Sequence, residues 1–188
     1  YDPDKFDNGM DGDTYYEVVE RDIKQAIKLL KKKPPVIEEP VIEKITDFKE
    51  LVKRLKFIRN NAELVVLDYE TTGLKPTNPG HRIAANAITY ESGGDVFNIS
   101  YPISYKGWFS EKQQDRIKEL TAEILKSDIP KVGHHIKFEE IWGDKILGTP
   151  TKNWIWCTMY CAHILDERPK HCSLKTQAFI YFQAPPYE

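Results

Sequence analysis

The sequence is poor in cysteine and contains no long apolar run. Its three cysteines, Cys157, Cys161 and Cys172, cannot form a closed disulfide framework, which favours a reducing compartment inside the cell. No apolar stretch approaches the roughly 18 residues that span a membrane, and the mean hydropathy is −0.54. The first residues also lack the basic and apolar pattern of a secretion signal. We therefore expect a cytoplasmic protein with no membrane partner.

The chain also has no strong excess of either charge. It carries 27 lysines and arginines against 29 aspartates and glutamates, a net charge of −2. This balance excludes a uniformly basic nucleic-acid coat protein. It does not exclude an enzyme acting on nucleic acid, because acidic metal ligands would offset basic residues elsewhere. With 188 residues, 40% of them hydrophobic, the chain is long enough for one α/β domain and a short appendage.

The first 40 residues differ from the rest in composition. An acidic, irregular stretch precedes apolar residues at helical spacing over residues 15–33, which predict a helix ending at three lysines. Residues 36–45 then indicate an extended linker, because Pro40 cannot lie inside a helix. We expect residues 1–40 to form an N-terminal helical appendage, and residues 46–188 to form the main domain.

Helix and strand patterns alternate from residue 46 onward. Thr46 is the expected N-cap of the first helix, and Ser110 with Gln113 has the pattern of a capping box at the start of another. The predicted fold is therefore α/β, with a mixed β-sheet flanked by helices. The predicted strands are residues 63–68, 82–90, 96–104 and 130–134, and the predicted helices are residues 46–57, 110–126, 138–147, 158–165 and 173–182.

Two acidic residues stand at the end of the first predicted strand. Asp68 and Glu70 are two positions apart, so in a strand both carboxylates project from the same face. Neighbouring like charges are unfavourable unless a cation lies between them, which makes a site for a hard metal ion an economical explanation. The alternative is a solvated strand end, since an acidic pair at this spacing also arises by chance.

A second group of chemically active residues follows the strand predicted at 130–134. It comprises two adjacent histidines, His134 and His135, and two carboxylates, Glu139 and Glu140. The carboxylates fall in the expected first turn of a helix, where the helix dipole favours negative charge and could by itself account for them. No cysteine or histidine lies at zinc-finger spacing from the histidine pair, so a structural zinc site is not favoured.

Together these segments resemble a known family. The stretch LVVLDYETTGLKP resembles the first motif, D-x-E, of DEDD-type 3′–5′ exonucleases, and KVGHHIKFEE resembles their second motif. Further on, WCTMYCAHIL and HCSLKTQAFIYF resemble segments of family A DNA polymerases. Residues 46–188 are thus similar to the proofreading exonuclease domain of the Klenow type, and the resemblance implies an RNase H-like sheet.

The resemblance also implies an activity and its cofactors. It implies removal of nucleotides from single-stranded 3′ ends of DNA, with two divalent ions, Mg²⁺ or Mn²⁺, held by Asp68, Glu70 and Glu139. The implied partners are the DNA end and a downstream polymerase domain of the same chain, in a bacterial or phage-infected cell, and we expect a monomer. The residues expected to contact the substrate are Thr71, Leu74, His135 and Phe138, whereas Trp142, Trp154 and Trp156 are expected to be packing residues.

Three departures from the family pattern leave alternatives open. Glu139 stands where the family has aspartate, and His135 stands where it has asparagine. The third motif, a tyrosine or histidine followed four residues later by aspartate, is not found up to residue 188, and we expect it downstream. The alternatives are a degenerate exonuclease fold acting as a scaffold or single-strand-binding module, and an RNA exonuclease of the RNase D kind.

Overall fold

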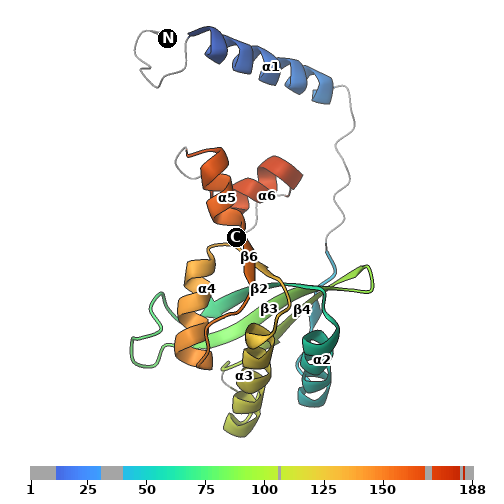
Figure 1. Ribbon diagram of the computed structural model, residues 1–188, viewed down its shortest axis with the longest axis vertical. Coiled ribbons are helices and arrows are strands. Elements are labelled where there is room, and N and C mark those ends of the chain that lie inside the picture. Colours follow the sequence, from blue (N-terminus) through green and yellow to red (C-terminus); the bar gives the residue numbers. More distant parts are fainter. Residues whose placement is uncertain (1–11, 31–39, 106, 168–170, 183, 185–188) are drawn as a thin grey trace. The chain divides into compact units, whose positions relative to one another are not determined.

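The computed structural model describes residues 12–30, 40–105, 107–167, 171–182 and 184 (Figure 1). The chain divides into two units, Tyr1–Glu38 and Glu39–Glu188. In the first unit the described residues form one helix, α1 (Gly12–Leu30), whose exposed face carries an ion pair between Lys24 and Glu20 at 2.7 Å. The acidic stretch before Gly12 and the lysines expected to end this helix lie outside the described residues.

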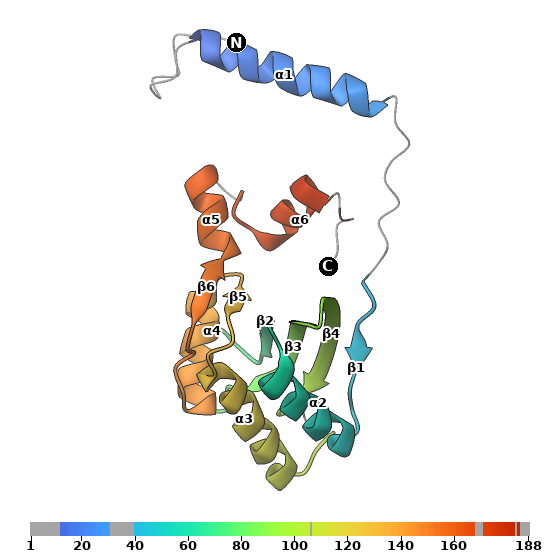
Figure 2. The ribbon, with the colours of Figure 1, turned by 45° about the vertical axis from the view of Figure 1, so that its right-hand side comes forward.

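The second unit is built on a mixed sheet whose strands run in the order β1-β4-β3-β2-β5-β6 (Figures 1 and 2). β2 pairs antiparallel with β3 and β3 with β4, whereas β2 with β5, β5 with β6 and β1 with β4 are parallel. The α/β fold with a mixed sheet is confirmed. The strands are β1 (Glu43–Lys44), β2 (Leu64–Thr71), β3 (Ile83–Ser92), β4 (Asp95–Pro102), β5 (Lys131–Gly133) and β6 (Trp154–Cys157).

Two amphipathic helices, α2 (Phe48–Asn61) and α3 (Glu111–Lys126), supply much of the core that packs against the sheet. The capping box of Ser110 and Gln113 is confirmed. The prediction for α2 was wrong by one residue: Asp47 is the N-cap, and its side chain accepts a hydrogen bond of 2.8 Å from the backbone N–H of Glu50. The buried residues of α2 and α3 include Leu51, Leu55, Ile58, Ile117, Leu120, Ile124 and Leu125.

The segment that follows β5 departs further from the sequence prediction. Instead of one helix over residues 138–147, α4 (Ile136–Trp142) continues into a π-helical turn, η2 (Gly143–Leu147). Two short helices follow, α5 (Thr158–Leu165) with the predicted bounds and α6 (Leu174–Phe182). Both β6 and β1 were missed, β1 because it lies inside the stretch predicted to be a linker.

The first residue of β5 is a lysine. Lys131 is fully buried, and its ammonium group donates hydrogen bonds to the carbonyl oxygens of Ser127, at 2.9 Å, and Ile129, at 2.8 Å. Burial lowers the pKa of Lys131 to about 8.

Trp142 is fully buried, as expected, whereas Trp156 is 54% exposed, so the expectation of packing was wrong for Trp156. In the described part of the chain, no helix has the length and apolarity to cross a membrane.

Candidate active site

The acidic pair lies on β2, which runs between β3 and β5. Asp68 and Glu70 are exposed, whereas Leu67 and Tyr69 are buried, so the two carboxylates share one face of the strand. This is the arrangement expected from strand geometry. Although Asp68 reaches the surface, its carboxylate has lost part of its solvent, and this loss, followed by the charge of the neighbouring Glu70, raises the pKa of Asp68. The pair is therefore held in mutual repulsion.

Helix α4 adds a third carboxylate. Glu139 is only 3% exposed, and its Oε2 accepts a hydrogen bond of 3.2 Å from the backbone N–H of Tyr69, the residue between the two acids of β2. Burial, followed by the charges of Asp68 and Glu70, raises the pKa of Glu139 to about 8, although the Tyr69 hydrogen bond opposes the shift. The structure thus brings Glu139 into electrostatic contact with both acids of the strand.

The chemistry of these side chains fits a divalent cation. Carboxylate oxygens are the preferred ligands of hard ions such as Mg²⁺, and a cation would offset the burial and the repulsion that together raise the pKa values of Asp68 and Glu139. Among the described residues, however, no three histidine, cysteine, aspartate or glutamate side chains are arranged as a metal site.

The last residue of β2 and the loop after it supply two of the residues expected to contact substrate, Thr71 and Leu74. The pairing of β2 with β3 is irregular between Glu70 and Thr71, a change of register of the kind that redirects side chains beside functional sites. The Thr71 hydroxyl donates a hydrogen bond of 2.8 Å to the carbonyl oxygen of Gly73. Leu74 is 84% exposed, so its side chain is available to a ligand.

The other two expected contact residues, His135 and Phe138, lie where α4 begins. His135 is exposed and has left-handed backbone angles, φ 62° and ψ 47°. Its ring stacks on that of Phe138, with centroids 6.2 Å apart, and Phe138 in turn packs against Trp142 and the core. Phe138 is therefore partly a packing residue, and His135 is the more accessible of the two rings.

Sequence reasoning missed the role of Glu140. Its carboxylate accepts hydrogen bonds from the backbone N–H of Thr151, at 3.1 Å to each oxygen, and from the Trp154 indole N–H, at 3.0 Å. Glu140 therefore ties α4 to β6, whereas Glu139, one residue earlier, faces β2. The two glutamates differ only because successive side chains of a helix point in different directions. No motif in the sequence indicates which of the two faces β2.

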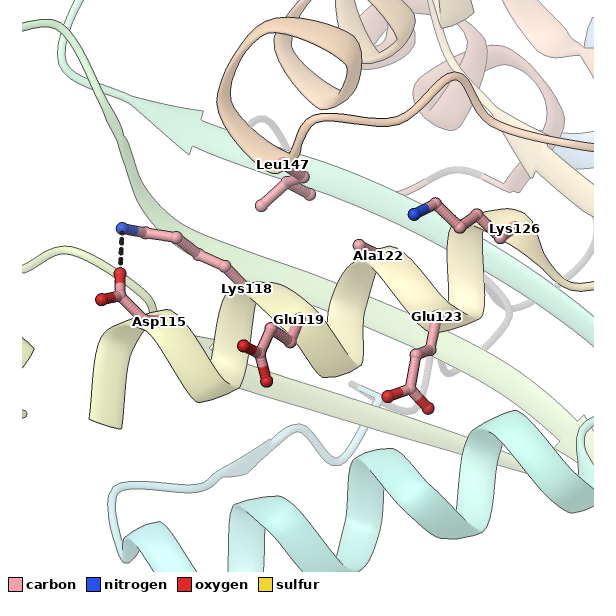
Figure 3. A pocket seen from close by; sticks show the side chains of 7 residues that line it. All are labelled: Asp115, Lys118, Glu119, Ala122, Glu123, Lys126 and Leu147. Carbon is pink, nitrogen blue, oxygen red and sulfur yellow. Dashed lines mark hydrogen bonds and ion pairs between the residues drawn. The ribbon is translucent and has the colours of Figure 1, made fainter. Parts of the chain in front are cut away.

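A groove of about 450 Å³ lies apart from these residues, along α3 (Figure 3). Its rim carries charges of both signs, including an ion pair of 3.1 Å between Lys118 and Asp115. None of the candidate site residues lines it. Its lining residues are Asp115, Lys118, Glu119, Ala122, Glu123, Lys126 and Leu147.

No protein-family model and no curated protein matches this sequence. Solved structures are similar in fold. NrnC of Brucella melitensis bound to pGG matches with a TM-score of 0.54 and 17% identity over 80% of this chain and 65% of that one. Escherichia coli RNase D, an exoribonuclease involved in structured RNA processing, matches with a TM-score of 0.54 and 15% identity over 79% and 35%. The POL domain of Pol1 from M. smegmatis has the same TM-score, with 15% identity over 77% and 23%.

These neighbours establish the fold. They include an exoribonuclease and a polymerase domain, and the chain has their α/β architecture. The RNase H-like fold expected from the sequence is thus confirmed. At 15–17% identity the likeness is one of fold alone. The chain spans about two thirds of the length of NrnC and about a third of that of RNase D.

Proposed function

We propose that this chain is a metal-dependent 3′–5′ exonuclease that removes nucleotides from single-stranded 3′ ends of DNA. The observation that carries the proposal is the buried carboxylate of Glu139, electrostatically coupled to Asp68 and Glu70 on a fold shared with exonucleases. Three acids in repulsion destabilise a protein that has no use for them, whereas a nuclease needs such a cluster.

In this proposal the three carboxylates hold two divalent ions, Mg²⁺ or Mn²⁺. Such ions lower the pKa of a water and stabilise the leaving oxygen of a phosphodiester. The backbone N–H of Tyr69 orients the Glu139 carboxylate toward β2. Leu74, exposed just beyond the acids, offers an apolar surface on which a terminal base can pack.

The choice of DNA over RNA rests on the polymerase-like segments WCTMYCAHIL and HCSLKTQAFIYF, which favour a proofreading role beside a polymerase domain. The second candidate is an RNA exonuclease. It is favoured by the likeness to E. coli RNase D, which equals the likeness to Pol1 in TM-score and in identity.

The test is degradation of a 5′-labelled single-stranded DNA oligonucleotide, and of the matched RNA, with Mg²⁺, Mn²⁺ or EDTA. We expect a ladder that shortens from the 3′ end of DNA, requires metal and disappears in Asp68→Ala. Asp115→Ala, which removes an exposed acid of α3, is the matched control and should cleave like the parent chain. Faster cleavage of RNA would select the second candidate.

Absence of cleavage in every condition, also with the complete gene product that carries any further motif, would overturn the nuclease proposal. Metal-independent binding of the oligonucleotide in that case would point to the degenerate, single-strand-binding alternative.

A further inference from the structure

We propose that His81 is a positioning residue that holds Leu74 ready for the terminal base of the substrate. The proposal rests on the function proposed above and names a residue that neither motif of the family resemblance contains. The observations come from the loop between β2 and β3. Residues far apart along this loop are joined by hydrogen bonds on both sides of one exposed apolar side chain, Leu74.

The base of the loop is closed by backbone contacts. The backbone N–H of Thr72 donates to the carbonyl oxygen of Arg82 at 3.0 Å, and the N–H of Arg82 donates to the Thr72 hydroxyl at 3.0 Å. Residues 73–81 therefore form a loop whose two ends are held together by the Thr72–Arg82 hydrogen bonds. Within them, the N–H of Asn78 donates to Lys75 and that of His81 donates to Asn78, at 3.2 and 3.1 Å, which folds the loop back on itself.

His81 lies over the start of this loop. A Cβ atom built on Gly73 would lie 2.3 Å from His81 Cε1 and 2.6 Å from its Nδ1, so the imidazole ring occupies the space that a side chain at Gly73 would need. The same ring donates a hydrogen bond from Nδ1 to the carbonyl oxygen of Lys75 at 2.9 Å. His81 thus contacts the residues on both sides of Leu74.

The backbone on both sides of Leu74 is anchored as a result. The carbonyl of Gly73 accepts the Thr71 hydroxyl, and the carbonyl of Lys75 accepts His81 and Asn78. Between these anchors the Leu74 side chain remains 84% exposed. A preorganised apolar side chain binds a ligand more tightly than a mobile one, because ordering it on binding is unfavourable. His81 acts on the substrate through Leu74 rather than by contact.

A double-mutant cycle tests this. The probe is a 5′-fluorescein oligothymidylate, and its dissociation constant is measured by fluorescence anisotropy in EDTA, so that no cleavage is needed. We expect Leu74→Ala to weaken binding about tenfold, the ratio that corresponds to ~1.4 kcal/mol. His81→Ala should weaken it about fivefold, and the double variant should bind no more weakly than Leu74→Ala alone.

Three further variants sharpen the cycle. Gly73→Ala, whose Cβ displaces the ring, should reproduce His81→Ala, and His81→Gln, which keeps a donor, should recover part of the affinity. Thr77→Ala, an exposed position of the same loop, is the control and should bind like the parent chain. With Mg²⁺, His81→Ala should raise KM and leave kcat within about twofold, whereas general loosening of the fold would lower kcat and the unfolding temperature.

Normal binding by His81→Ala, or single-variant losses that multiply in the double variant, would overturn the proposal. The fate of the proposed function is read separately. If the parent chain binds the probe and the variants behave as the cycle predicts, but no cleavage is ever seen, the proposal for His81 stands and the proposed nuclease activity is refuted. A parent chain that neither binds nor cleaves refutes both.

Discussion

The two halves of the acidic site are built in opposite ways. The half on β2 consists of Asp68 and Glu70, which lie at the surface on one face of a strand. The half on α4 is Glu139, buried to 3% exposure and hydrogen-bonded to the backbone of the strand. The exposed half is accessible to solvent, whereas burial raises the pKa of the buried half to about 8. Burial and the two neighbouring carboxylates make ionisation of Glu139 unfavourable, and a nearby positive charge would make it more favourable.

The largest effect should come from removing the exposed half. We expect Asp68→Ala to reduce exonuclease activity about a thousandfold, because metal-borne stabilisation of transition-state charge is worth several kcal/mol. Its unfolding free energy should not fall, since the repulsion with Glu70 disappears. Initial rates on single-stranded DNA and urea unfolding of the same samples check both parts. An active Asp68→Ala variant would remove the exposed half from the mechanism.

The next effect concerns metal binding to the folded protein. Mg²⁺ or Mn²⁺ at about 100 times its dissociation constant should stabilise the domain by ~2.7 kcal/mol relative to EDTA. Thermal unfolding measures this shift, which should vanish in Asp68→Ala and shrink in Glu70→Ala. If the metal stabilised the two variants as much as the parent chain, the ion would bind elsewhere and not at Asp68 and Glu70.

The buried half should be recognised by its dependence on pH. The pKa of Glu139 is raised from 4.5 to about 8, so between these values the folded state keeps a proton that the unfolded state releases. Stability in EDTA should therefore fall as the pH rises from about 4.5 to 8, by up to ~1.4 kcal/mol for each pH unit in that window. Glu139→Gln keeps an acceptor for Tyr69 and should flatten the profile.

Glu91→Gln, on the exposed part of β3, is the control and should leave the profile unchanged. A profile that stays steep in Glu139→Gln would assign the pH dependence to other groups.

The smallest effect concerns the residue at which α4 begins. His135 has left-handed backbone angles, a conformation that asparagine adopts readily and alanine does not. His135→Asn should leave the domain as stable or more stable by about 0.5 kcal/mol, and His135→Ala should destabilise it by about 1 kcal/mol. Urea unfolding orders the three proteins. A more stable alanine variant would show that the backbone angle exerts no strain.

The strand half of the site could be predicted from the sequence because its geometry is local. Side chains two positions apart on a strand share a face, and the apolar residues from Leu64 to Leu67 mark the strand. The same locality explains why helix α5 and the capping box of α3 were predicted correctly. The left-handed conformation of His135 could not be predicted, because no local pattern marks it.

What could not be predicted depends on contacts between distant segments. The family resemblance named Glu139 as a site residue, but no local pattern reveals its hydrogen bond to Tyr69, 70 positions away, or the burial that raises its pKa. Glu140 has the same chemistry and takes a different role. The helix cap at Asp47 rather than Thr46 was missed because adjacent residues offer nearly equivalent oxygens, and only the backbone angles choose between them.

Strand β1 has a practical consequence for anyone who prepares this domain. Its two residues pair with Ile99 and Ser100 at the edge of the sheet, and Ile45 directly after it is 3% exposed and donates its backbone N–H to Ser100 at 2.9 Å. A fragment beginning at Thr46 would omit this cover and leave part of β4 unpaired, and an unpaired edge invites strand addition from neighbouring molecules. Expression should therefore start no later than Glu39, where the second unit begins.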